Sequence, residues 1–147
     1  GHRECRIPLG KWLQSAVPAN TVLAMSDVGV TPYYSRLNTF DINTESLADI
    51  HIAKHGFSID YVMGKLPGVI LLTCRGIYSA KMDPAHFSFY KSDAFRSNYG
   101  FIGTSRCEWF NDRCYWVFFR HDIPLSVKSG ESFPVGIGNQ QRTGWEL

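Results

Sequence analysis

Hydrophobic residues in the first half of the chain follow the periods of short helices and of fully covered strands. Between Pro8 and Pro18 the apolar residues recur at helical spacing, and the two prolines bound the segment, which predicts a short helix. The runs 21–26 and 69–74 are apolar at nearly every position. Such runs indicate strands covered on both faces. A second short strand is expected over 37–42, after a glycine-proline turn that carries Tyr33 and Tyr34.

Two helices are predicted between these strands, over 47–55 and 59–65. Leu47, Ile50 and Ala53 have helical spacing, Gly56 suits a helix end, and Ser58 suits the cap of the next helix. Helices that alternate with buried strands predict an α/β fold with a mostly parallel central sheet flanked by short helices.

The second half of the chain has a different pattern. We expect a loop over 76–84, a helical stretch over 92–98, and a C-terminal antiparallel β-hairpin with arms 99–110 and 114–121. Both faces of the second arm are apolar, which places that arm in the interior of the sheet. Residues 126–147 form a loop-rich tail with many glycines. We therefore expect one domain over residues 1–147, with Gly1 and His2 as a cloning remnant.

Composition and charge narrow the classes of function. The chain has 147 residues, 44% of them hydrophobic, which is enough for one sizeable core. Its net charge is +2 and its basic residues are scattered, so we expect no nucleic-acid partner. No apolar run approaches the ~20 residues of a spanning helix, and the first 20 residues do not resemble a signal peptide.

Four cysteines bear on the compartment. None forms a Cys-x-x-Cys pair, which argues against a zinc site. Cys107 and Cys114 flank the turn of the predicted hairpin, and a loop over 109–112 would put them opposite each other, within disulfide reach. We expect this disulfide and, with it, an oxidising extracytoplasmic compartment. The pairing of Cys5 and Cys74 stays open.

Two aspartates follow the predicted strands of the first half. Asp27 and Asp41 stand where these strands end, and ligands of α/β folds gather outside the carboxyl ends of strands. With His51, they could form the acid/base set of a small hydrolase. An aspartate in this position more often caps a turn, so we expect no catalytic residue in the chain.

A metal site is a further hypothesis. His51 and His55 are four residues apart on the same predicted helix, and Asp49 lies beside them. This spacing suits metal ligands, but the glutamate of a His-Glu-x-x-His motif is missing, and an exposed helix face accommodates the same residues. We therefore expect neither a resident metal nor a cofactor.

The aromatic residues are the stronger functional lead. Trp109 falls at the predicted hairpin tip, and Tyr33 and Tyr34 fall in a turn, where burial is not expected. Exposed flat rings pack on sugars or lie at membrane interfaces, whereas a tyrosine that closes the edge of the core is the alternative. The predicted ligand-binding residues are Asp27, Tyr33, Tyr34, Asp41 and Trp109.

Several short motifs together resemble a known family. They are the segments 12–13, 17–24, 27–29, 32–35, 40–42, 47–49, 52–53, 66–71, 98–101 and 115–122. Their order resembles the soluble C-terminal region of polytopic bacterial GT-C-type glycosyltransferases, over roughly residues 9–125. The chain departs from that pattern in two places. The loop is longer by residues 43–46, and Gly68 stands where an aspartate is common after the proline.

The resemblance implies a parent enzyme that uses polyprenyl-phosphate sugars and whose catalytic acid lies in its membrane portion. This chain would then be a non-catalytic extracytoplasmic accessory domain, tethered to the transmembrane portion of the parent chain. Its implied partners are that portion and a glycan or lipid-linked sugar. The alternatives are a free-standing hydrolase that uses Asp27, Asp41 and His51, and a structural protein-interaction domain.

Overall fold

The structure is a computed structural model, and it describes residues 6–26, 29–42, 49–75, 87–106 and 113–126. The helices within these ranges are α1 (Ile7–Ala16), α2 (Val30–Ser35), α3 (Ile50–His55), α4 (Ile59–Gly64), α5 (Phe87–Lys91) and α6 (Asp93–Asn98). The strands are β1 (Val22–Met25), β2 (Asn38–Asp41), β3 (Val69–Arg75), β4 (Tyr99–Arg106) and β5 (Arg113–Arg120).

The strands form one sheet in the order β2-β1-β3-β5-β4. β1 pairs in parallel with β2 and β3, whereas β5 pairs antiparallel with β3 and β4. The prediction of a mostly parallel sheet is therefore wrong, because the sheet is mixed. The predicted hairpin exists, but its second strand is inserted between β3 and the first strand. β5 alone runs against the other four strands, and both of its pairings are antiparallel.

The apolar residues of β5 explain why this strand is inside the sheet. Tyr115, Val117 and Phe119 join the core on one face, and Trp116 and Phe118 join the core on the other. A strand with two apolar faces is most stable where both faces are covered and shielded from water. The prediction of an interior second arm is confirmed, and so is the central position of the strands over 21–26 and 69–74.

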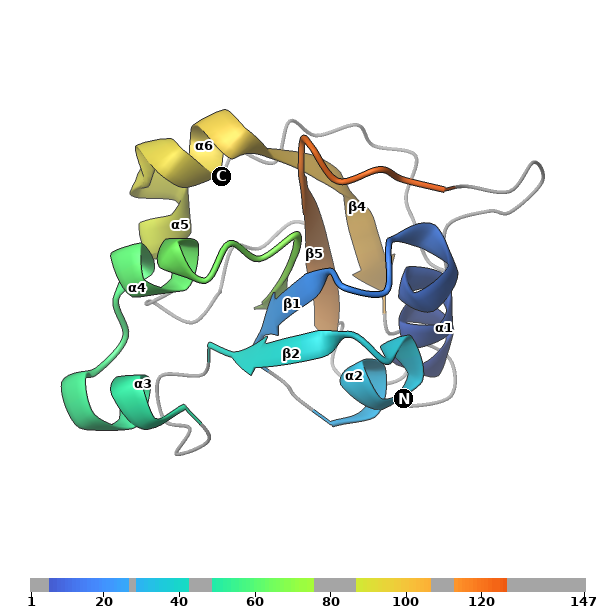
Figure 1. The fold of residues 1–147 in the computed structure, drawn as a ribbon, viewed down its shortest axis with the longest axis horizontal. Helices are drawn as coiled ribbons and strands as arrows, with labels where there is room; N and C mark the ends of the chain where they lie inside the picture. Colours follow the sequence, from blue (N-terminus) through green and yellow to red (C-terminus); the bar gives the residue numbers. More distant parts are fainter. Residues whose placement is uncertain (1–5, 27–28, 43–48, 76–86, 107–112, 127–147) are drawn as a thin grey trace.

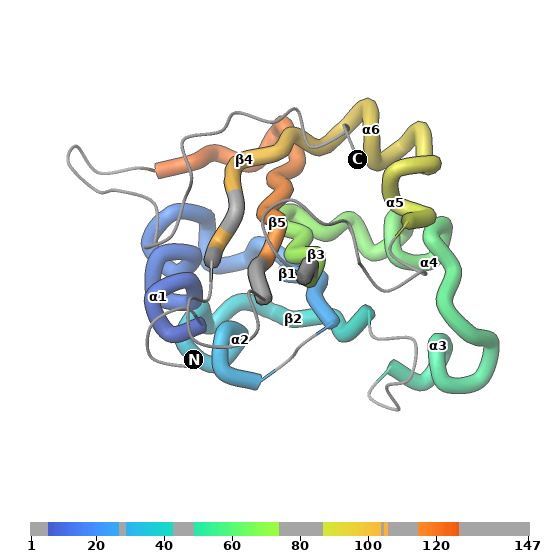
Figure 2. The backbone as a smooth tube through the Cα atoms, turned by 180° about the vertical axis from the view of Figure 1, so that it is seen from behind, coloured from blue at the N-terminus to red at the C-terminus, as the bar shows by residue number. Residues whose placement is uncertain are grey.

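The helices cover the sheet in two layers (Figure 1). On one face, α1 contributes Leu9, Trp12 and Leu13 to the core and α2 packs against α1. On the other face, α4, α5 and α6 contribute Val62, Phe89 and Phe95. The view from behind shows the same separation, with α3 at the periphery beyond α4 (Figure 2).

Side-chain caps start three of these helices. Ser58 accepts a hydrogen bond from the Tyr61 amide at the start of α4, and Ser92 accepts one from the Phe95 amide at the start of α6. Both helices lie where the sequence predicts them. α3 is capped by Asp49, which accepts from the Ile52 amide.

Two short helices, α2 and α5, are absent from the sequence prediction. α2 occupies the segment interpreted as a glycine-proline turn. Gly29, with φ 146°, precedes it, and Pro32 fits because the first-turn residues of a helix need no intrahelical N–H partner. A helix of five or six residues spans fewer than two turns, and α2 begins without the side-chain cap that marks α4.

One hydrogen-bonded group fixes the start of β3, and we call it the Pro67 cluster (Leu66, Pro67, Gly68, Tyr99 and Arg120). The Tyr99 hydroxyl donates to the Pro67 carbonyl oxygen. The Arg120 guanidinium donates to the Leu66 carbonyl oxygen at 2.6 Å, and the Arg120 amide donates to the Gly68 carbonyl oxygen at 2.9 Å. The cluster joins β3, β4 and β5 through backbone carbonyl groups.

The strand register bears on the cysteines. The backbone of Cys114 in β5 lies opposite Arg106 in β4 and opposite Cys74 in β3. Cys5 and Cys107 lie outside the described residues. The Cys107–Cys114 disulfide stays a prediction.

Candidate functional site

Of the two aspartates expected at the carboxyl ends of the first two strands, the structure describes Asp41. Asp41 ends β2, with its Cα opposite Met25 of β1, and only 8% of it is exposed. Asp27 and Trp109 lie outside the described residues, as does the tail beyond residue 126. An aspartate this buried offers little surface to a ligand.

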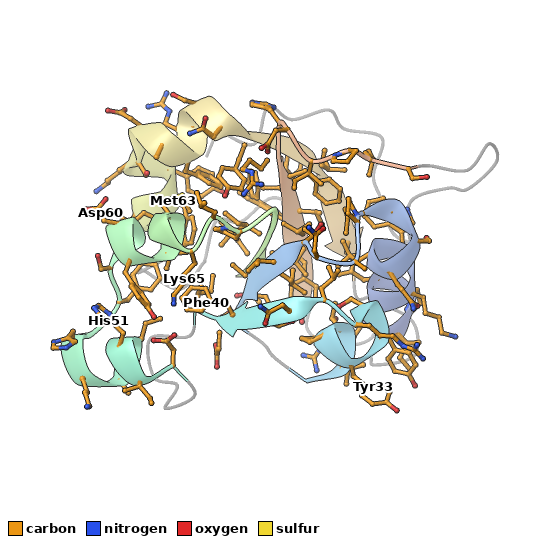
Figure 3. All side chains as sticks on the ribbon, viewed as in Figure 1. Tyr33, Phe40, His51, Asp60, Met63 and Lys65 are labelled. Atoms are coloured by element: carbon orange, nitrogen blue, oxygen red, sulfur yellow. The ribbon has the colours of Figure 1, made fainter. Side chains whose placement is uncertain are left out.

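Tyr33 and Tyr34 lie on a surface formed by α1 and α2, which we call the tyrosine surface (Lys11, Tyr33, Tyr34 and Arg36). Tyr33 is 76% exposed, the most exposed large hydrophobic residue among those described. Its ring meets the Tyr34 ring edge-to-face, with centroids 5.2 Å apart. In Figure 3 the Tyr33 side chain points away from the body of the molecule. The expectation that the two tyrosines escape full burial is met by this geometry.

The close approach of α1 and α2 holds Tyr34 in place. A Cβ at Gly10 would lie 2.7 Å from the Thr31 carbonyl oxygen and 2.8 Å from the Cβ of Tyr34, so only glycine permits this contact. Tyr34 is half-buried as a result, and Tyr33, the next residue along the chain, faces solvent.

The charge of the tyrosine surface has one sign. Lys11 places its Nζ 5.7 Å from the centroid of the Tyr34 ring, and exposed Arg36 directly follows α2. α1 and α2 contain no aspartate or glutamate. The surface therefore combines an exposed aromatic ring with cationic hydrogen-bond donors.

A second group of polar and aromatic side chains joins β2, α3 and α4. We call it the Tyr61 cluster (Phe40, Asp49, His51, Tyr61 and Lys65). The Tyr61 hydroxyl donates to the Asp49 carboxylate at 3.0 Å, and the Tyr61 ring stacks on the His51 imidazole with centroids 3.9 Å apart. Phe40 meets Tyr61 edge-to-face at 5.7 Å. Figure 3 shows Phe40, His51 and Lys65 on the same side of the molecule, away from Tyr33.

Lys65 completes the Tyr61 cluster from the end of α4. Its Nζ lies 5.1 Å from the Tyr61 centroid and 6.0 Å from the Phe40 centroid, within cation–π range of both rings. Partial burial by itself would raise the pKa of Asp49. Hydrogen bonds from the Ile52 amide, the Tyr61 hydroxyl and the His51 amide, with the Lys65 charge, outweigh that and lower the pKa.

The structure gives the predicted metal and catalytic residues other contacts. His51 and His55 are neighbours, with ring centroids 4.8 Å apart, but Asp49 is directed to Tyr61 and Ile52. Among the described residues, no three His, Cys, Asp or Glu side chains are grouped to hold a metal ion. His51 contacts Tyr61 and His55, on a peripheral helix. These contacts offer no support to the hydrolase alternative.

Sequence reasoning missed three members of the Tyr61 cluster: Phe40, Tyr61 and Lys65. Phe40 lies in β2, Tyr61 lies in α4, and Lys65 directly follows α4. Asp49 and Tyr61 are twelve residues apart in the chain. No periodicity connects them, because the contact depends on how the Tyr61 side chain of α4 meets Asp49 and His51 at the start of α3. No signal in a single sequence would have found this set.

Comparison with known proteins identifies a family. The model of one family, described as a domain of unknown function (DUF8728), matches residues 2–118. The chain belongs to the DUF8728 family. The DUF8728 match includes both the tyrosine surface and the Tyr61 cluster. No curated protein and no solved structure matches the chain. In the part of the chain that the structure describes, none of the helices has the length and apolar character needed to cross a bilayer.

Proposed function

We propose that this DUF8728 chain is a non-catalytic extracytoplasmic accessory domain of a membrane glycosyltransferase, and that it binds a glycan on the tyrosine surface. The observation that carries the glycan-binding part is the Tyr33 ring, 76% exposed and braced edge-on by Tyr34. A flat ring of this kind packs against the apolar face of a sugar, and its braced position reduces the entropy lost on binding.

The polar residues of the tyrosine surface suit the hydroxyl groups of the same ligand. Lys11 supplies a cationic donor over the Tyr34 ring, and exposed Arg36, the residue after α2, supplies a second. Hydrogen bonds from charged donors are stronger than those from neutral donors, and they fix the orientation of a ligand whose ring packs on Tyr33.

The glycan-binding part is tested by titrating the ¹⁵N-labelled chain with cell-envelope oligosaccharides. We expect chemical-shift changes confined to α1 and α2. Tyr33→Ala should weaken binding about fivefold or more, because stacking on an aromatic side chain contributes about 1–3 kcal/mol in the case of nucleic-acid bases. Tyr33→Phe retains the ring and should retain most of the affinity.

Leu66→Ala is the matched control, because Leu66 is a similarly exposed apolar residue, at 67%, outside the tyrosine surface. It should leave glycan binding unchanged. Equal loss in Leu66→Ala and Tyr33→Ala, or no shift with any oligosaccharide, would reject glycan binding at this surface and favour the protein-interaction alternative.

The parent enzyme is tested separately. The reading frame that encodes this chain should also encode several apolar segments of about 20 residues, each able to span a bilayer. A frame without such segments would reject the glycosyltransferase part of the proposal and leave the sugar-binding test unaffected.

A further inference from the structure

The Tyr61 cluster has the chemistry of a site for an organic cation. The rings of Phe40 and Tyr61 stand at 72° to each other, so they form two walls of a corner. The electron-rich faces of aromatic rings attract ammonium groups, and two rings at an angle attract one better than a single ring does. The Asp49 carboxylate, held by the Tyr61 hydroxyl at 3.0 Å, adds a negative charge beside this corner.

The corner already contains a cation from the chain itself. Lys65 Nζ lies 5.1 Å from the Tyr61 centroid and 6.0 Å from the Phe40 centroid. Its charge also acts on Asp49. The Lys65 ammonium thus occupies the place that the ammonium group of a ligand would take.

Lys65 is a replaceable occupant. The residue is exposed, and its side chain has no hydrogen bond or ion pair among the contacts of the described residues. Cation–π contacts at exposed sites change affinity only by about two- to fivefold, so a ligand with comparable chemistry can compete with the tethered ammonium. Tethering favours Lys65 through its high local concentration.

We propose that Phe40, Tyr61 and Asp49 form a binding site for an organic ammonium group, and that Lys65 occupies this site in the absence of the ligand. The ligand class includes quaternary ammonium compounds, primary alkylamines and amino sugars with a free amine. The site lies apart from the tyrosine surface (Figure 3), so the proposal does not depend on the function proposed above.

The test titrates the ¹⁵N-labelled chain with tetramethylammonium chloride, against sodium chloride at the same ionic strength. We expect shift changes at the Tyr61 cluster at millimolar concentrations. Lys65→Ala should bind about two- to fivefold tighter, because it removes the competing ammonium and the positive charge that acts on Asp49. This gain distinguishes the proposal from a purely structural cluster, in which the variant gains nothing.

Three further variants serve as controls. Lys54→Ala removes the same charge from the exposed face of α3 and should leave binding unchanged. Phe40→Leu removes one wall while Tyr61 still holds Asp49, and Tyr61→Leu removes the other wall; each should weaken binding about two- to fivefold. Because Tyr61→Leu also releases α3, thermal unfolding of each variant is measured, and Phe40→Leu decides the outcome if Tyr61→Leu does not fold.

Matched ligands identify the source of the amine. Glucosamine and N-acetylglucosamine differ in charge at one nitrogen, and n-butylamine represents a lysine side chain. Shifts with glucosamine alone assign an amino sugar, and shifts with butylamine and tetramethylammonium but not glucosamine assign an alkylammonium group. The proposal is overturned if no cation shifts the resonances of the Tyr61 cluster in the unsubstituted chain or in Lys65→Ala. It is also overturned if Lys54→Ala strengthens binding as much as Lys65→Ala.

Discussion

The Pro67 cluster and the Tyr61 cluster each depend on a tyrosine hydroxyl, but they use it differently. Tyr99 is buried, and its hydroxyl donates to a backbone carbonyl at the start of β3. Tyr61 is half-buried, and its hydroxyl donates to a carboxylate on a peripheral segment. The first arrangement satisfies backbone groups inside the fold. The second leaves the Asp49 charge and the exposed His51 ring near the surface.

This difference shows that conspicuous sequence motifs can serve the fold. Leu66, Pro67, Tyr99, Arg120 and Asp122 all belong to segments on which the glycosyltransferase resemblance rests. In the structure they hydrogen-bond one another at the start of β3, and Arg120 also pairs with Asp122 at 2.5 Å. In the Tyr61 cluster, Tyr61 and Lys65 belong to no such segment, whereas Phe40 and Asp49 do.

The largest expected effect concerns Gly68. A Cβ there would lie 2.5 Å from Thr21 Cγ2 and 2.8 Å from Ile123 Cδ1, so the site has no space for a side chain. We expect Gly68→Ala to lower the free energy of unfolding by about 2–3 kcal/mol, measured by urea denaturation, because inserted carbon displaces well-packed neighbours.

Gly64→Ala is the control for Gly68→Ala. A Cβ at Gly64, in α4, would have no atom within 4 Å. The free energy of unfolding of this variant should equal that of the unsubstituted chain or exceed it by up to about 1 kcal/mol, because alanine favours the helix. Equal destabilisation of the two variants would show that the Pro67 cluster is no more tightly packed than the layer beside the Tyr61 cluster.

The second prediction concerns alkaline pH. Burial raises the pKa of Tyr99 from 10 to about 12, although the Arg120 charge opposes the shift. The folded chain then holds a proton that the unfolded chain releases, so Tyr99 stabilises the fold fully below pH 10. That contribution, on the order of 2 kcal/mol, is lost as the pH rises from 10 through about 12.

Tyr99→Phe checks this prediction. At neutral pH we expect it to cost about 1–2 kcal/mol, because the Pro67 carbonyl loses its donor. Between pH 10 and 12 its unfolding free energy should fall less steeply than that of the parent. Burial also raises the pKa of Tyr90, so part of the alkaline loss remains in the variant. Identical slopes in parent and variant would contradict the assignment to Tyr99.

The smallest expected effect is at acid pH and involves the Tyr61 cluster. The pKa of Asp49 lies below 3.8 in the folded chain, so the unfolded chain binds the proton first as the pH falls. Asp49 therefore stabilises the fold above about pH 4, and this contribution is lost as the pH falls through the folded pKa. Asp49→Asn retains a capping side chain and removes the titration.

We expect Asp49→Asn to change the neutral stability by less than about 1 kcal/mol, because the group is near the surface. Its unfolding free energy should depend less on pH below 4 than that of the parent. A steeper acid dependence in the variant would mean that Asp49 does not have the lowered pKa given by its contacts with Tyr61 and Lys65.

Local sequence signals determined most of the individual elements. The two-sided apolar runs over 69–74 and 114–121 identified β3 and β5 as interior strands, and Ser58 marked the start of α4. These features depend on residues close together in the chain, so their periodicity and capping are readable. The pairing of β5 with β3 is not readable, because the pattern of a strand does not say which other strand it lies beside.

Only the tertiary structure decided the arrangement of the sheet and of the Tyr61 cluster. The mixed sheet arises because β5 enters between β3 and β4, a choice made by burial of both of its faces. Asp49, Tyr61 and Lys65 meet because the Tyr61 side chain of α4 reaches the residue that caps α3, and Lys65 at the end of α4 lies over the same ring. Contacts between side chains on separate elements depend on packing in three dimensions, and a single sequence carries no period that records them.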